Sequence, residues 1–191
     1  MASVLSAPDG RPTFSLGESG NNGTATASIG PEGGTITMGN SAVVFPAGSI
    51  CDPATSSYGP GTWDDACTPL TAPITITATI KTTGQGTWVD FSPALRFVPS
   101  TNSSRWVWLA LFSKKKIGAS ELSRFNIYYA ATLGGAFVDE TASDATLRTY
   151  VDTKSGVSTR RIKHFSGYGS WGDSCDPSVD PTCTDVPPPA S

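Results

Sequence analysis

The chain has 191 residues, of which 38% are hydrophobic and 15% are charged, and its formal net charge is −3 at pH 7. A phosphate backbone is bound by a basic surface, so this charge balance argues against a nucleic-acid-binding protein. A chain of this length can bury its own core as one domain, and it contains no apolar run near the roughly 20 residues that span a bilayer.

The N-terminal segment is predicted to be an extended arm. Residues 1–27 are rich in Ala, Ser, Gly, Asn and Thr, and Phe14 and Leu16 are the side chains expected to anchor the arm. Residues 1–12 lack both the basic region and the long apolar region of a signal peptide, so we expect no export signal in the chain as given.

A β-hairpin is predicted over residues 34–46. Two short apolar runs are separated by a turn at Gly39 and Asn40, and Pro46 ends the second run because proline cannot donate to a β-ladder. The later apolar segments are expected to form strands that pack onto this hairpin.

The cysteine pattern indicates two disulfide-closed loops. Four cysteines allow three connectivities, and the simplest is sequential pairing. It joins Cys51 with Cys67 and Cys175 with Cys183. The first bridge is worth roughly 3 kcal/mol in the loop-entropy description. Disulfides persist in oxidising compartments, which indicates a periplasmic or extracellular protein. The competing hypothesis, a four-cysteine zinc site, fits poorly because zinc ligand pairs are usually separated by about two to four residues.

The first disulfide loop is expected to contact a partner. Residues 50–73 contain no strand pattern, and a loop of that length without secondary structure is usually functional or part of an interface. Its aromatic residues Tyr58 and Trp63 are the side chains that we expect to make this contact.

Seven further segments are predicted to be strands. None of them shows a sustained apolar period of 3.6 residues, so little or no helix is expected. Residues 74–80 alternate apolar side chains with threonine, and residues 106–112 are the most apolar segment and are expected at the centre of a sheet. The predicted strands cover residues 74–80, 88–98 (interrupted at Pro93), 106–112, 125–130, 136–139, 147–152 and 157–165, a pattern typical of an all-β antiparallel sandwich.

The composition changes after Trp171, and residues 173–191 are predicted to be a tail outside the sandwich. The domain organisation is therefore an arm (1–27), a β-sandwich domain (28–172) and this tail. Three consecutive prolines stiffen the tail into polyproline II, which suits a strap on a partner: Pro187, Pro188 and Pro189.

Calcium is a competing hypothesis for the tail. The tail carries four aspartates, but their spacing matches no known calcium loop, and Asp-Pro is a common way to start a turn. We therefore expect no metal and no cofactor. The four residues are Asp173, Asp176, Asp180 and Asp185.

Three motifs in order resemble a known family. The first motif is Gly33-Gly34-Thr35 together with Pro46-Ala47-Gly48. The second motif is residues 91–97 (Phe-Ser-Pro-Ala-Leu-Arg-Phe), and the third is residues 164–168 (His-Phe-Ser-Gly-Tyr). Their order resembles the domain shared by zonula occludens scaffolds, ankyrins and uncoordinated-type netrin receptors, in the form found in bacterial exported proteins. The resemblance covers residues 28–170 and implies a β-sandwich with a binding or structural role.

The third motif carries the sharpest chemical hypothesis. In some relatives with a death domain, and in one unrelated nucleoporin fold, a His-Phe-Ser triplet cuts its own backbone. The resemblance implies that Ser166 is the nucleophile, that His164 is the base, and that the bond between Phe165 and Ser166 is cut. The competing interpretation is structural: Phe165 fills the end of the sandwich and the Ser166 hydroxyl bonds a nearby loop.

The pattern as a whole favours a protein without a catalytic role. We expect a structural or interaction module, an exported bacterial subunit that docks on other subunits of a periplasmic, cell-surface or membrane-embedded assembly. The arm, the first disulfide loop and the tail are its expected contacts. Self-cleavage is one alternative. A glycan-binding module is another, because Trp106 and Trp108 lie on one face of a predicted strand.

Overall fold

The structure is a computed structural model that describes residues 4–6, 11–14, 22–82, 86–112, 122, 125–131 and 136–171. Among these residues there are β-strands and three short turns of 3-10 helix, and there is no α-helix. The strands are β1 (Val4–Ser6), β2 (Pro12–Phe14), β3 (Gly23–Ile29), β4 (Gly34–Met38), β5 (Ser41–Phe45), β6 (Ile74–Thr82), β7 (Gly86–Ser92), β8 (Val107–Phe112), β9 (Asn126–Ala130), β10 (Tyr150–Asp152), β11 (Val157–Ile162) and β12 (Gly167–Trp171). The 3-10 turns are η1 (Ser103–Arg105), η2 (Glu140–Ala142) and η3 (Ala145–Leu147).

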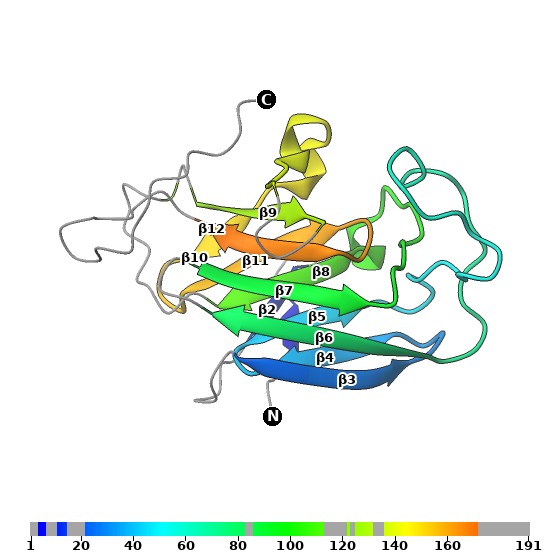
Figure 1. The fold of residues 1–191 in the computed structure, drawn as a ribbon, viewed down its shortest axis with the longest axis horizontal. Coiled ribbons are helices and arrows are strands. Elements are labelled where there is room, and N and C mark those ends of the chain that lie inside the picture. The colour runs from blue at the N-terminus through cyan, green and yellow to red at the C-terminus, as the bar shows by residue number, and fades with distance from the viewer. Residues whose placement is uncertain are drawn as a thin grey trace.

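Ten of these strands form two antiparallel sheets that pack against each other (Figure 1). One sheet has the strand order β10-β11-β8-β5-β4, and the other has the order β3-β6-β7-β12-β9. Strands β1 and β2 form a separate antiparallel pair. The predicted all-β antiparallel sandwich is therefore confirmed.

The core lies between the two sheets and follows from alternation along the strands. On β6, Ile76, Ala78 and Ile80 are buried while the threonines between them face outward, as a side-chain period of two requires. Strand β8 is buried along nearly its whole length and is the third of five strands in its sheet. The predicted central position of this apolar segment is thus confirmed.

One strand of the sandwich begins inside the segment predicted to be the arm. Strand β3 starts at Gly23 and pairs with β6 over its whole length, so the expected arm boundary at residue 27 falls within a strand. The sequence signal is weak here because β3 alternates threonine or serine with alanine, and small side chains give little hydrophobic contrast. Of the predicted anchors, Phe14 lies in β2, and Leu16 lies outside the described residues.

Two predicted strands are replaced or shortened by turns. Residues 136–139 contribute a single bridge to β9, and the strand predicted at 147–152 is reduced to β10, with η3 before it. The reason is local, because the carboxylates of Asp139 and Asp144 each accept a hydrogen bond at 2.9 Å from the backbone N–H two residues later. These N-caps start helical turns directly after the first predicted strand and up to the first residue of the second.

Proline and glycine limit the strands where the backbone needs special geometry. Strand β7 ends at Ser92, immediately before Pro93, so the segment predicted over residues 88–98 is interrupted at the expected position. Gly33 has a φ of +80°, and a Cβ at this position would lie 2.2 Å from the carbonyl oxygen of Phe45. Only glycine fits both conditions, which explains why a glycine opens the hairpin.

One end of the sandwich brings together two segments that are far apart in the sequence. The connection between β5 and β6, drawn in cyan and teal, lies at the same end as the turn between β11 and β12 (Figure 1). A disulfide between Cys51 and Cys67 closes this connection and confirms the first predicted pair, whereas Cys175 and Cys183 lie outside the described residues. We call residues 51–67 the disulfide loop.

Candidate functional site

The single histidine of the chain is fully buried in the turn between β11 and β12, residues 163–166, which we call the histidine turn. The imidazole of His164 stacks on the indole of Trp63 with a centroid distance of 4.0 Å. The ring of Tyr129 on β9 meets it edge-on at 4.9 Å. The disulfide loop, β9 and the histidine turn therefore enclose the imidazole together.

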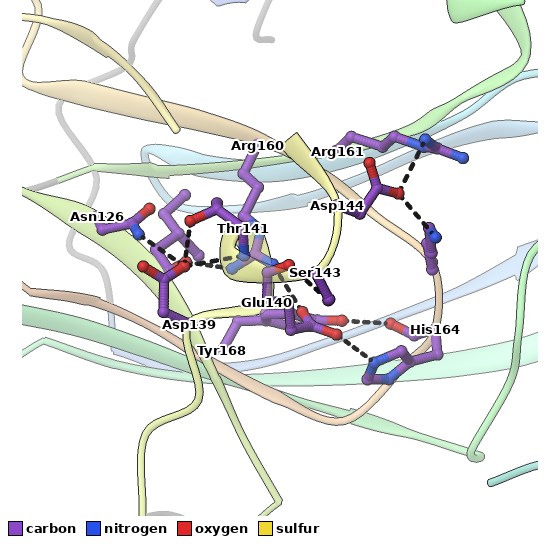
Figure 2. Close-up of polar contacts among 12 residues, drawn as sticks. Asn126, Asp139, Glu140, Thr141, Ser143, Asp144, Arg160, Arg161, His164 and Tyr168 are labelled. Carbon is purple, nitrogen blue, oxygen red and sulfur yellow. Dashed lines mark hydrogen bonds and ion pairs between the residues drawn. The ribbon is translucent and has the colours of Figure 1, made fainter. Parts of the chain in front are cut away.

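Glu140 connects this histidine to a buried arginine (Figure 2). The Oε1 atom of Glu140 lies 3.1 Å from Nε2 of His164, and its Oε2 atom lies 2.6 Å from Nη2 of Arg160, whose side chain is 0% exposed. Arg160 also donates a hydrogen bond to the backbone carbonyl of Ile127. Burial raises the pKa of Glu140, but the hydrogen bond with His164 and the charge of Arg160 outweigh it, so this pKa lies below its ordinary value.

The contact with Glu140 also defines the tautomer of the imidazole. An ionised carboxylate only accepts hydrogen bonds, so the proton lies on Nε2, and in the neutral ring the lone pair is then on Nδ1. The Nδ1 atom is buried and has no hydrogen-bond partner among the described residues. The hydroxyl of Tyr168 donates to the backbone carbonyl of His164 at 2.8 Å. His164 thus presents one buried acceptor on a backbone that is held in place.

Basic side chains on β11 and the histidine turn are covered by the acidic segment that contains η2 and η3. The Nζ atom of Lys163 lies 2.7 Å from a carboxylate oxygen of Asp144 and 2.7 Å from one of Asp64. Arg161 lies 3.8 Å from Asp144. Burial raises the pKa of Asp144, but hydrogen bonds from Lys163 and Thr146 lower it more, to about 2. Charge pairing therefore fixes this segment onto β11.

The disulfide loop is held against the sandwich by Arg96. Its Nη1 atom donates to the backbone carbonyls of Thr62 at 3.0 Å and Asp65 at 2.6 Å, and its Nη2 atom donates to that of Ala66 at 3.3 Å. A planar guanidinium can satisfy several acceptors in a fixed geometry, which suits it to hold an irregular loop. Arg96 also forms a backbone bridge with His164, so one residue contacts both the loop and the histidine turn.

The peptide bond between Phe165 and Ser166 lies where the loop meets the turn. The ring of Phe165 is fully buried and stacks on Phe91 at 4.2 Å, so it fills the end of the core. Its carbonyl oxygen accepts a hydrogen bond from the Ser166 hydroxyl at 2.7 Å and a second one from the hydroxyl of Tyr58. The hydroxyl oxygens of Tyr58 and Ser166 are 2.9 Å apart. Two hydroxyl groups therefore meet at one backbone carbonyl.

The structure joins the predicted triplet to two residues for which we predicted another role. His164, Phe165 and Ser166 lie beside Tyr58 and Trp63, which we expected to contact a partner. One face of the Trp63 ring is covered by His164, whereas Tyr58 remains 42% exposed. The three prolines of the predicted strap lie outside the described residues.

Sequence reasoning missed Glu140, Arg160 and Tyr129, which complete the surroundings of the histidine. These residues come from three separate segments, and no local pattern connects any of them to the His-Phe-Ser triplet. One signal was available: two consecutive arginines, Arg160 and Arg161, occur within a predicted strand. An arginine that is buried in a sheet needs a carboxylate or carbonyl partner, so this pair indicates an acidic segment packed nearby.

Trp106 and Trp108, on which the hypothesis of a glycan-binding module depends, do not form an exposed pair. Trp108 is 3% exposed, and the indole nitrogen of Trp106 donates to the carbonyl of Ser100 at 2.7 Å. The guanidinium of Arg161 covers the Trp106 ring at 4.3 Å. In the part of the chain that the structure describes, no three His, Cys, Asp or Glu residues are grouped to hold a metal ion.

The comparisons with known proteins give no significant match: no family model, no curated protein and no solved structure is similar. Among the described residues, no helix has the length and hydrophobicity needed to cross a membrane. The fold and the candidate site are therefore the main basis for a functional proposal.

Proposed function

We propose that the protein is a non-catalytic interaction module, an exported accessory subunit that docks on other subunits of a periplasmic or cell-surface assembly. The observation that carries this proposal is the open edge of β3, which pairs with β6 on one side and with no described residue on the other. The disulfide between Cys51 and Cys67 supports an oxidising compartment. The resemblance to scaffold and receptor domains supports a binding role.

The sequence of β3 lacks the residues that usually protect an edge strand. It is seven residues long, against five in the edge strands β4 and β9 and three in β10. Its sequence contains neither a charged residue nor a proline, the usual means of preventing edge-to-edge pairing. By contrast, β9 is partly covered by the bridge from Val138 to Tyr129. An extended strand of a partner can therefore continue the sheet at β3, next to the edge of β4 (Figure 1).

Replacing Thr26 by lysine is expected to reduce the recovery of a partner about tenfold or more, because a lysine on an edge strand opposes pairing. Thr26 is exposed at the middle of β3. The measurement is affinity purification of the tagged chain from its native host in mild detergent, followed by quantitative mass spectrometry of the recovered chains.

Thr77→Lys is the matched control for this test. Thr77 lies directly opposite Thr26 on β6, and their hydroxyl oxygens are 3.2 Å apart. Both variants break the same contact and add the same charge to the same face, but only Thr26→Lys changes an edge. Equal losses of the partner in the two variants, or no loss in either, would exclude β3 as the docking edge.

We propose self-cleavage between Phe165 and Ser166 as a second candidate function, because one specific observation favours it. The Ser166 hydroxyl lies 2.7 Å from the carbonyl oxygen of the preceding residue. His164 comes directly before this pair, and its buried Nδ1 atom is hydrogen-bonded neither to the Ser166 hydroxyl nor to any other described residue. In an N-to-O acyl shift the serine hydroxyl attacks that carbonyl and an imidazole accepts the proton.

Under this second function, purified protein is expected to accumulate a fragment of residues 166–191, which Ser166→Ala abolishes. The measurement is intact mass under denaturing conditions, which separate fragments that stay packed together. Ser166→Cys keeps a nucleophile at the same position and is expected to retain the fragment. A wild-type chain that stays intact over several days would leave the interaction module as the proposed function.

A further inference from the structure

The carbonyl group of Phe165 meets a hydrogen-bond donor from a distant part of the sequence. The hydroxyl of Tyr58, in the disulfide loop, donates to the Phe165 oxygen and lies 2.9 Å from the Ser166 hydroxyl oxygen. The Ser166 hydroxyl in turn lies 2.7 Å from the same carbonyl oxygen. A nucleophile, the carbonyl that it can attack and a donor to the carbonyl oxygen are therefore in direct contact.

Tyr58 reaches this position because the disulfide loop is fastened at several points. The Cys51–Cys67 bond closes the loop, and the guanidinium of Arg96 holds three of its backbone carbonyls. On the side of the histidine turn, Trp63 stacks on His164 at 4.0 Å. An ion pair of 2.7 Å links Asp64 of the loop to the lysine that precedes His164. The loop has almost no buried apolar side chain of its own, so these contacts hold Tyr58 in place.

We propose that Tyr58 is a catalytic residue of the self-cleavage at Phe165–Ser166, and that the Cys51–Cys67 disulfide is required because it holds Tyr58 on the reacting carbonyl. This inference rests on the second of the two functions proposed above. It assigns to the disulfide loop a task other than contact with a partner, and it makes the reaction dependent on an oxidising compartment.

The reaction needs no group other than residues of this chain and water. The Ser166 oxygen bonds to the carbonyl carbon of Phe165, and the hydroxyl proton passes to Nδ1 of His164, which makes no hydrogen bond to Ser166 before the reaction. The bond from that carbon to the Ser166 nitrogen then breaks, and His164 returns the proton to the nitrogen. The product is an ester of Phe165 on the Ser166 oxygen. Water hydrolyses it to a Phe165 carboxylate and restores the hydroxyl of Ser166, which is now the N-terminal residue of the released fragment.

Tyr58 acts on the charge that develops in this reaction. When the serine oxygen adds to the carbonyl, the Phe165 oxygen becomes an anion, and a donor that already points at it stabilises the transition state. Burial raises the pKa of Tyr58, so its phenol keeps the proton that it donates at neutral pH. A phenylalanine keeps the ring but provides no donor.

The test measures how fast the Tyr58→Phe variant and the wild-type protein each form the fragment of residues 166–191. Both proteins are incubated with hydroxylamine, which reacts with the ester and releases this fragment. Loss of the donor is expected to slow fragment formation about a hundredfold, the usual effect of removing one oxyanion donor. Tyr150→Phe is the matched control and is expected to cut at the wild-type rate. Tyr150 lies on β10, and its hydroxyl accepts a hydrogen bond from Arg148 rather than contacting the Phe165 carbonyl. Thermal unfolding of each variant shows whether the fold is retained.

A second measurement does not depend on substitution at Tyr58. Two samples lack the disulfide: wild-type protein reduced with a phosphine, and the double variant Cys51→Ser with Cys67→Ser. We expect both to cut at least about tenfold more slowly than the oxidised protein, because the Tyr58 hydroxyl is no longer held on the Phe165 carbonyl. Cleavage at the oxidised rate in either sample would overturn the requirement for the disulfide.

The outcomes separate this inference from the function on which it rests. A Tyr58→Phe protein that cuts at the wild-type rate, while Ser166→Ala does not cut, would overturn the role of Tyr58 and leave self-cleavage in place. A wild-type protein that releases no fragment even in hydroxylamine would overturn both. If the Tyr58→Phe variant fails to fold, the comparison of oxidised with reduced wild-type protein tests whether the disulfide is required to hold Tyr58 in place.

Discussion

Replacing Glu140 by alanine is expected to lower the free energy of unfolding by about 3–5 kcal/mol, the usual cost of breaking a buried ion pair on one side. Arg160 is fully buried and would lose the carboxylate that lies 2.6 Å from its guanidinium. His164 would lose the acceptor for its Nε2 proton in the same step. Urea unfolding followed by tryptophan fluorescence measures the change.

Two comparisons show whether the unpaired charge is the cause. Glu32→Ala removes an exposed carboxylate from a turn and is expected to change the unfolding free energy by no more than about 0.5 kcal/mol. The double variant Glu140→Leu with Arg160→Met removes both buried charges, and we expect it to recover most of the loss. A cost below about 1 kcal/mol for Glu140→Ala would mean that this network contributes little to the fold.

Replacing Phe165 by alanine is also expected to cost about 3–5 kcal/mol, because the cavity adds to the lost burial of the ring. The Phe165 ring is 0% exposed, stacks on Phe91 at 4.2 Å and meets Phe97 edge-on at 5.0 Å. It joins the two sheets at the end of the sandwich where the disulfide loop docks. Denaturant unfolding gives the magnitude directly.

The control for this substitution is Phe137→Ala, which removes an equal volume from a half-buried position outside the core. We expect it to cost about half as much or less, since less apolar surface is lost. If both variants were equally destabilised, the end of the sandwich would not depend on Phe165 in the way that its contacts indicate.

Much of the fold could be predicted from local patterns. The side chains of β6 alternate between apolar and polar with a period of two, which predicts a half-buried strand. The side chains of β8 are apolar throughout, which predicts a strand at the centre of a sheet. The pair Cys51–Cys67 is the simplest of the three connectivities that the sequence allows, and the structure confirms it. The family resemblance on the three motifs remains a prediction.

Other parts of the fold could not be predicted because their signals are weak or compete with each other. Strand β3 contains only small side chains before Ile29, and its place in the sheet depends on pairing with β6, which is far away in the sequence. Around η2 and η3, aspartate caps start helical turns between the two strands predicted at residues 136–139 and 147–152. There the local hydrogen bonds prevail, and the segment is held on β11 by charge pairing as well as by the buried side chain of Leu147.

The amino-acid sequence by itself determined the strand periodicity and the contiguous triplet His164-Phe165-Ser166, and it favoured the pairing of Cys51 with Cys67 as the simplest of three connectivities. Only the tertiary structure decided what surrounds this triplet: Tyr58 on the Phe165 carbonyl, and Glu140 between His164 and Arg160. The physical reason is that periodicity and loop closure are properties of neighbouring residues. The partner of a buried charge or hydroxyl is chosen by the packing of whole sheets and loops, which no local stretch of the chain encodes.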